Sequence, residues 1–192
     1  FQGDRPGYAF TERFTESALQ QTLADALSHC QFTESLPIEL PSVQVLGEPF
    51  PTYNPQLESL SLQQLTQTCL DIEQATRAQS SEIVNIPYLG ADLTHSLTLF
   101  ANHRGVWHEQ RSNAFSVGIG AVAERGSTKK MGVYNKNGRD FSVVSADQMA
   151  AVVASRSVEL LGAQPIRGGR LPVVFSERIS GSLLGMFLSA FY

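Results

Sequence analysis

Apolar residues recur at the spacing of an amphipathic helix in three stretches of the chain. Thr15 can cap a helix that runs to about Cys30, Ser61 opens a second helix, and Ser145 caps a third that Gly162 closes. Each stretch predicts a helix with one apolar face that is at least half buried. The three stripes are Ala18, Leu19, Leu23, Ala26 and Leu27; Leu62, Leu65, Cys69, Ile72 and Ala75; and Met149, Val152, Val153, Ser157 and Leu160.

A proline-rich connector separates the first two helical patterns, from Gln31 to about Leu60. Proline lacks a backbone N–H and its ring clashes with the preceding helical turn, so this stretch excludes regular helix. The pattern predicts a long connection that lies over the surface. Its prolines stand at positions 37, 41, 49, 51 and 55.

Beyond Ser81 the pattern changes to short runs that alternate or are continuously apolar, which is typical of strands. We expect an antiparallel meander, with turns at His103-Arg104-Gly105 and Asn137-Gly138. Its strands cover residues 83–89, 96–102, 105–110, 114–124 and 130–134. The predicted fold class is therefore α+β, with helices packed on an antiparallel strand meander.

Near the end of the chain, the apolar run at residues 171–175 predicts one more buried strand. A helix is expected to follow it, with Ser176, Glu177 and Arg178 in the first turn. Ser176 is suited to the N-cap, and the positive end of the helix dipole favours Glu177. Polar groups at such a junction often belong to a site.

The composition is that of a globular protein, with 42% apolar and 17% charged residues. A net charge of -4 gives no basic surface for nucleic acid. No apolar run approaches the roughly 18 to 20 residues that a membrane-spanning helix needs. Cys30 and Cys69 lack the spacing of a zinc ribbon and are expected to be two buried thiols.

The histidines give little support for a metal site. His103 and His108-Glu109 lie in or beside a strand, where a separation of five residues places side chains on opposite faces. His29 and His95 are isolated, which indicates surface or helix-end positions.

Other motifs also favour structural roles. Gly118-Ile119-Gly120 lies within a strand with no helix after it, so it predicts close backbone approach or a bulge and not a dinucleotide site. Ser182 is not part of a GxSxG elbow, and Gly181 and Gly185 share a helical face that permits close packing. Trp107 is a candidate partner anchor or a packed aromatic residue. The residues alone therefore predict no autonomous active site.

Three longer segments resemble the TldD/PmbA family, the modulators of DNA gyrase. They are "GYAFTERFTESALQQTLADAL", "NHRGVWHEQRSNAFSVGIGAVAE" and "AAVVASRSVELLGAQPIRGGRLPVVFS", and together they span most of the chain. The resemblance implies a TldD/PmbA N-terminal α/β domain at residues 1–170, and the truncated start of a β-rich C-terminal domain at residues 171–192. Because the chain begins without methionine and ends on an apolar helix, we expect a piece of a longer protein.

The TldD branch of this family resembles a zinc metallopeptidase with an HExxxH helix, in which two histidines bind the metal and the glutamate activates water. In "FSERISGSLLGMF", Ser176 stands at the expected first histidine, Glu177 is retained and Ser180 stands at the second histidine. The chain therefore resembles the PmbA/TldE branch, which lacks the motif. The resemblance implies no catalytic residue and no cofactor in this chain, and zinc in a partner subunit.

The resemblance implies a non-catalytic subunit of a cytoplasmic zinc-dependent metalloprotease in peptide proteolysis or maturation. Its partners would be a TldD-like zinc-bearing subunit in a heterodimer, or a second copy in a homodimer, and a peptide substrate, with no nucleic acid or membrane. One alternative is a protein-interaction module of the gyrase-modulator type with no role in proteolysis. Another is a metallopeptidase whose ligands lie in a missing C-terminal half. Possible contacts with peptide or partner are Trp107, Arg111, Asn113 and Ser116, although each also fits a solvated strand face.

Overall fold

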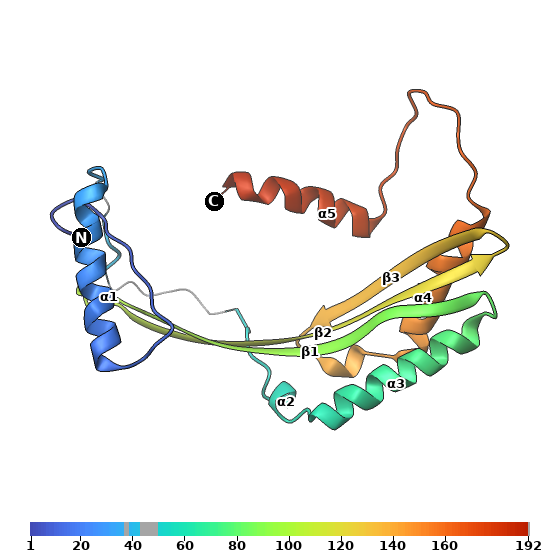
Figure 1. Ribbon diagram of the computed structural model, residues 1–192, viewed down its shortest axis with the longest axis horizontal. Helices are drawn as coiled ribbons and strands as arrows, with labels where there is room; N and C mark the ends of the chain where they lie inside the picture. The colour runs from blue at the N-terminus through green and yellow to red at the C-terminus, as the bar shows by residue number, and fades with distance from the viewer. Residues whose placement is uncertain (37–38, 43–49, 192) are drawn as a thin grey trace.

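The computed structural model describes residues 1–36, 39–42 and 50–191. Helices α3 and α4 pack on one side of a sheet, α5 lies on its other side, and α1 stands at the far end of a long hairpin (Figure 1). The helices are α1 (Glu16–His29), α2 (Pro55–Glu58), α3 (Leu62–Gln79), α4 (Ala146–Glu159) and α5 (Glu177–Leu188), and the strands are β1 (Ile83–Ala101), β2 (Trp107–Arg125) and β3 (Thr128–Gly138). Short 3-10 turns cover Cys30–Phe32, Phe141–Val143, Leu160–Gly162 and Ser189–Phe191.

The sheet has three antiparallel strands in the order β1-β2-β3. The meander and the α+β class are confirmed, but the expected five shorter strands form three long ones. The stretch at residues 83–89 and the stretch from residue 96 to Ala101 are parts of one strand, β1. The stretch from Trp107 to residue 110 and the stretch at residues 114–124 are parts of another, β2. Polar residues between these stretches do not interrupt a strand, because one face of the sheet is open to solvent and accepts them.

Of the two predicted turns, one is wrong. The β1–β2 turn includes His103-Arg104-Gly105, and Gly105 has φ 83°. Asn137 and Gly138 instead close β3, where they pair with Ser116 and Phe115. The β2–β3 turn lies at the other end of β3, where Gly126 has φ 60°. An Asn-Gly pair permits a tight turn but does not impose one when a paired strand is available.

The core lies between the sheet and the α3–α4 layer. Every second residue of β2 from Asn113 to Ala123 faces the helices and is buried. Because successive strand residues point to opposite faces, the residues between them line the open face. The core consists of Leu57, Ile72, Ile83, Phe115, Val117, Ile119, Ala121, Ala123, Met149, Val153 and Ala154.

The predicted caps are confirmed. Thr15 accepts from the backbone N–H of Ala18, and Ser145 accepts from that of Gln148. Ser61 and Gln64 form a complete capping box at the start of α3. Gly162 ends the short turn that follows α4.

Several predicted apolar positions are exposed. No residue of α1 is buried, and Leu62 of α3 is 79% exposed because the sheet lies under later turns of that helix. Leu160 is also exposed. Cys30 is buried as expected, whereas Cys69 is only half-buried.

The final strand is absent. Residues 171–175 form no strand, and Val174 is 97% exposed. An apolar run becomes a strand only when a neighbouring strand edge pairs with it, and within the described residues none does. The connector also contains the short helix α2, which begins at Pro55 and buries Leu57. Pro55 at the first helical turn is tolerated because no intrahelical N–H bond is needed there.

Candidate functional site

The first turn of α5 carries the polar residues that sequence analysis predicted. Ser176 precedes the helix, and its carbonyl accepts a 2.8 Å hydrogen bond from the N–H of Ser180. This bond is the first of the helix, so Ser176 occupies the N-cap position. Glu177 is the first helical residue, where the helix dipole favours a carboxylate.

A pocket of about 480 Å³ opens beside this turn, between α5 and the outer strand of the sheet. Its polar groups are amides, a guanidinium, a carboxylate and hydroxyls, which suit hydrogen bonding to a polar or peptide ligand. The lining residues are Val133, Tyr134, Asn135, Asn137, Arg156, Glu177 and Ser182.

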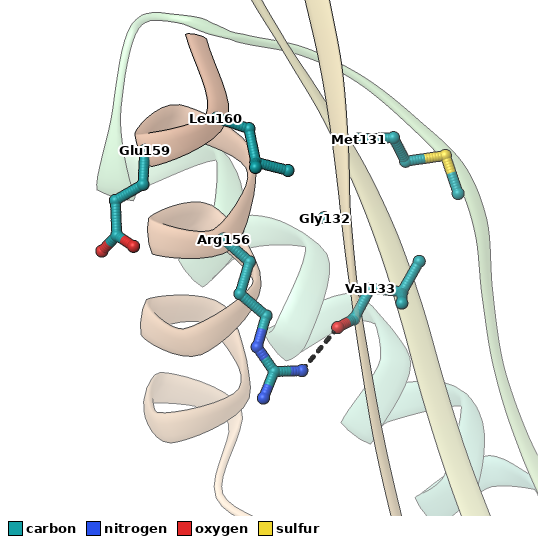
Figure 2. Close-up of a pocket in the computed structure, with 6 residues that line it drawn as sticks. All are labelled: Met131, Gly132, Val133, Arg156, Glu159 and Leu160. Carbon is teal, nitrogen blue, oxygen red and sulfur yellow. Dashed lines mark hydrogen bonds between the residues drawn. The ribbon is translucent and has the colours of Figure 1, made fainter. Parts of the chain in front are cut away.

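Arg156 is held in place at the boundary of this pocket. Its Nη1 donates to the carbonyl of Val133 at 2.7 Å, and its guanidinium lies 5.0 Å from the centre of the Tyr134 ring. The same side chain lines a neighbouring hollow of about 310 Å³ with Met131, Gly132, Glu159 and Leu160. Figure 2 shows Arg156 reaching from α4 to Val133, whereas Glu159 points away from the strand. Arg156 therefore separates two small hollows.

The α5 residues do not fit a zinc site. In HExxxH the second histidine follows the first by five residues, so with Ser176 at the first position the second is Gly181, and the assignment of Ser180 was wrong by one residue. Zinc in proteins is bound by Cys, His, Asp and Glu, and only Glu177 belongs to that set. In the described part of the chain, no three such side chains form a group that could hold a metal ion.

The histidines are dispersed. His29 lies at the end of α1 with its Nδ1 2.7 Å from the Tyr8 carbonyl oxygen, as expected for a helix-end residue. His103 lies in the β1–β2 turn, and His108 in β2 pairs with Phe100 in β1. These positions bring none of the three side chains to the α5 pocket.

Asn113 has a structural role. Its side chain is buried, its Oδ1 accepts from the Asn54 N–H at 2.8 Å, and its Nδ2 donates to the Asn54 carbonyl at 2.8 Å. Both ends of the amide are therefore used by the chain's own connector. The hypothesis of a peptide or partner contact at Asn113 conflicts with this geometry.

The other predicted contacts are accessible and lie on different faces. Ser116 is exposed on the open face, in one cross-strand row with Asp92 and Asn137. Trp107 is 70% exposed, and Arg111 is exposed with its Nε 3.6 Å from Glu109 Oε1. Trp107 and Arg111 share the opposite face because they are four residues apart in one strand.

A further polar hollow of about 270 Å³, which no sequence motif indicated, lies where the helical layer ends. The pKa of the Tyr53 hydroxyl is raised above its usual value, chiefly by a hydrogen bond to the Glu58 carboxylate. His95 and Arg111 line the same hollow. A sequence signal for this hollow was available in Asn54-Pro55, because an N-cap residue followed by proline predicts the start of a helix. A short helix from Pro55 places Tyr53 just before its first turn and Glu58 at its end.

Comparison with known proteins agrees with this fold. The model of the PmbA/TldA metallopeptidase central domain matches residues 55–162, which is more than half of the chain. The chain belongs to the TldD/PmbA family. No curated protein matches it. Residues 55–162 run from α2 to the turn after α4, so the family match covers the sheet and its helical layer.

Three solved structures share the fold at low sequence identity. A putative modulator of a DNA gyrase from Thermotoga maritima has a TM-score of 0.75 at 16% identity, over 88% of this chain and 38% of that one. TldE from Thermococcus kodakarensis has a TM-score of 0.70 at 14% identity, over 82% and 36%. A putative modulator of DNA gyrase from Bacteroides thetaiotaomicron has a TM-score of 0.75 at 11% identity, over 85% and 39%. The chain thus spans less than two fifths of each structure.

Among the helices of the described residues, none is both long enough and apolar enough to cross a bilayer.

Proposed function

We propose that the intact protein is a non-catalytic PmbA/TldE-like subunit of a cytoplasmic zinc-dependent metalloprotease that acts in peptide proteolysis or maturation. It pairs with a TldD-like subunit that carries the zinc. The observation that carries this proposal is the match to a metallopeptidase family over residues 55–162, and it is supported by Ser176 and Gly181 at the two positions where the resemblance would place the histidines of HExxxH.

The contribution of this chain is to bind extended peptide beside the catalytic subunit. The open face of the sheet supports this role at Gly90, where a Cβ would meet nothing within 4 Å; its pair Gly118 is covered by the Asn135 side chain, and Gly120 by the Tyr88 ring. Next to them, Asp92, Ser116 and Asn137 form a row of polar side chains. A shallow surface with hydrogen-bonding groups at its border suits a peptide backbone, which needs both close approach and polar partners.

The test is co-purification with a homologue that contains HExxxH. The intact protein and that homologue are expressed separately and together, and each preparation is assayed for zinc content and for cleavage of unfolded peptides. We expect a stable pair, zinc in proportion to the homologue only, and cleavage by the pair. Stoichiometric zinc with peptidase activity in the protein alone would contradict the proposal.

A peptide-binding role for the open face has its own variant. Ser116→Arg places a long cation in the centre of the polar row, whereas Ser127→Arg alters an exposed residue in the β2–β3 turn. We expect Ser116→Arg to raise the KM of the pair for peptide several-fold and at most about tenfold, a factor that corresponds to about 1.4 kcal/mol. The zinc content of the pair should not change. Equal KM values for both variants would show that the open face does not bind the substrate.

A second candidate function is a protein-interaction module with no role in proteolysis. Two structures with this fold are described as putative modulators of DNA gyrase, which favours keeping this alternative. It predicts that the intact protein retains its partner when the HExxxH homologue is deleted, and that adding it leaves peptide cleavage unchanged. The co-purification experiment therefore separates the two functions.

A further inference from the structure

The polar hollow of about 270 Å³ lies between the connector and the β1–β2 hairpin, and its lining residues differ from those of the pocket beside α5. Tyr53 of the connector and Glu58 of α2 form one wall. His95 and Leu97 of β1 and Arg111 of β2 form the other wall. Leu97 pairs with Arg111 across the two strands, and alternate residues of a strand share a face. The hairpin therefore presents these three side chains on one face.

The connector wall is fixed to β2 on both sides of Tyr53. The Thr52 carbonyl accepts a 3.0 Å hydrogen bond from the Asn113 N–H, and the Thr52 hydroxyl donates to the Arg111 carbonyl at 2.8 Å. Asn54 exchanges two further hydrogen bonds with the Asn113 amide, both of 2.8 Å. The chain itself thus holds Tyr53 beside the strand that carries Arg111. A preformed site of this kind loses little conformational freedom when a ligand binds.

Glu58 is held by the burial of its neighbour. Leu57 is 1% exposed and belongs to the core, so α2 cannot turn without removing this side chain from the core. The Glu58 carboxylate accepts a hydrogen bond from the Tyr53 hydroxyl, which raises the pKa of Tyr53, and the Arg111 guanidinium acts against that rise. The Tyr53 hydroxyl is therefore close to one charged group of each sign.

Both charged groups keep the capacity to bind a ligand. A carboxylate offers about four acceptor positions, so Glu58 can accept from a ligand ammonium as well as from Tyr53. The ion pair of Arg111 with Glu109 spans 3.6 Å from Nε, which is longer than a hydrogen bond, and the Arg111 side chain is 66% exposed. A guanidinium has five N–H donors in a planar arrangement that matches a carboxylate.

A ligand that matches this hollow carries an ammonium and a carboxylate only a few bonds apart. Pockets for drug-sized ligands have volumes of about 300 to 1,000 Å³, so a hollow of about 270 Å³ favours a smaller molecule. Leu97 adds an apolar contact surface, because it is 62% exposed. These features together describe a free α-amino acid with an apolar side chain.

We propose that the hollow binds such an amino acid, with its carboxylate on Arg111, its ammonium on Glu58 and its side chain against Leu97. Each charged end of the ligand then meets a group of opposite charge, and both contacts are charge-assisted hydrogen bonds. The site does not depend on the proteolytic role proposed above.

Titration of the intact protein, without any partner subunit, tests this site by calorimetry. L-leucine is compared with isocaproate, which is leucine without its ammonium, and with isopentylamine, which is leucine without its carboxylate. Hydrogen bonds to charged groups are the stronger ones, so we expect saturable binding of L-leucine and binding at least about tenfold weaker for each analogue.

Substitutions at the two charged groups assign the two ends of the ligand. Arg111→Gln should weaken the binding of L-leucine about tenfold and leave isopentylamine binding almost unchanged, whereas Glu58→Gln should spare isocaproate instead. A general loss of structure would weaken all three ligands, so the pattern reports the contacts themselves. The matched controls are Arg13→Gln and Glu12→Gln, which remove the same charges at exposed positions before α1 and should change no affinity.

The apolar contact has its own comparison. Leu97→Ala should reduce the preference for L-leucine over glycine several-fold, because it removes surface that only the larger ligand contacts. Leu99→Ala shortens an exposed leucine of the same strand that does not line the hollow, and it should leave the preference unchanged.

Three outcomes would overturn the proposal. They are the absence of saturable binding of L-leucine, isocaproate or isopentylamine binding as tightly as L-leucine, and equal effects of the hollow variants and their controls. Failure of the protease role would appear instead as absent zinc or absent cleavage in the pair, and it would leave these titrations unchanged.

Discussion

The hydroxyl of Ser157 accepts a 3.0 Å hydrogen bond from the backbone N–H of Gly132, fully buried between α4 and the sheet. The same oxygen lies 2.9 Å from the Ala121 carbonyl and 2.8 Å from the Val153 carbonyl, to either of which it can donate. One side chain of α4 thereby connects β2 and β3. The close approach requires glycine at position 132, because a Cβ there would lie 2.7 Å from Ser157 and from the Val153 carbonyl oxygen.

Gly132→Ala should destabilise the protein. The added methyl group meets backbone atoms that cannot move without shifting α4, and overpacking of this kind costs about 1 to 3 kcal/mol. Urea unfolding at neutral pH measures the change in the free energy of unfolding. Gly90→Ala is the matched control, since a Cβ on this strand glycine meets nothing within 4 Å. Equal effects of the two substitutions would show that α4 does not constrain position 132.

Asn113→Ala should loosen the attachment of the connector to β2, which keeps the bond from the Asn113 N–H to the Thr52 carbonyl. It leaves the N–H and carbonyl of the half-buried Asn54 without their partners, which costs at most about 1 to 3 kcal/mol. We expect faster proteolysis near Tyr53 as well as lower stability. Thr98→Ala changes an exposed residue of β1 and should change neither proteolysis nor stability. Unchanged cleavage in Asn113→Ala would mean that other contacts hold the connector.

Gly7→Ala should detach the N-terminal segment from α1. A Cβ at this position would lie 1.9 Å from the Ala26 carbonyl oxygen and 2.6 Å from Cys30 Sγ. We expect Cys30, which is buried, to become reactive to a thiol reagent at least several-fold faster. Gly3→Ala does not serve as a control because Gly3 has φ 64°, so the comparison is Gly162→Ala, where a Cβ meets nothing within 4 Å. Unchanged reactivity would show that the segment tolerates the side chain.

Glu82→Gln should lower stability in a manner that depends on pH. The hydrogen bond from Arg125, with Nη2 2.8 Å from Oε2, lowers the pKa of the Glu82 carboxyl below its usual 4.5. A lowered folded-state pKa gives stability that is present above the unfolded pKa and is lost as the pH falls through the folded value. The difference between wild type and Glu82→Gln should therefore be constant near neutral pH and vanish in acid. A difference that persists in acid would assign the effect to packing.

Local signals explain what the sequence could predict. Thr15, Ser61 and Ser145 were identified as caps because capping depends on residues within one turn. The two long-range features were less accessible. The role of Asn113 depends on a residue 59 positions away, and the absence of a strand at residues 171–175 depends on which strand edges lie near them, since neither outer edge of the described sheet pairs with this stretch.

The candidate site shows the same limit. The first turn of α5 was predicted from Ser176 and Glu177, but Asn135, Asn137 and Arg156 come from β3 and α4 and carry no motif. Leu62 and Leu23 fitted apolar stripes and are nevertheless exposed, because periodicity identifies a face without saying what covers it.

The position of α4 after all three strands has a consequence for synthesis. As the chain emerges from its N-terminus, α3 and the complete sheet are made before α4, which buries Val153 against it and supplies the Ser157 bridge. Until about residue 159 has left the ribosome, Ile119 and its neighbours lack the cover that α4 provides. The two outer strand edges of the sheet are also open to other chains at this stage. Translation that pauses before α4 has left the ribosome should therefore produce an aggregation-prone nascent chain, whereas a pause after the whole of α4 has emerged should not.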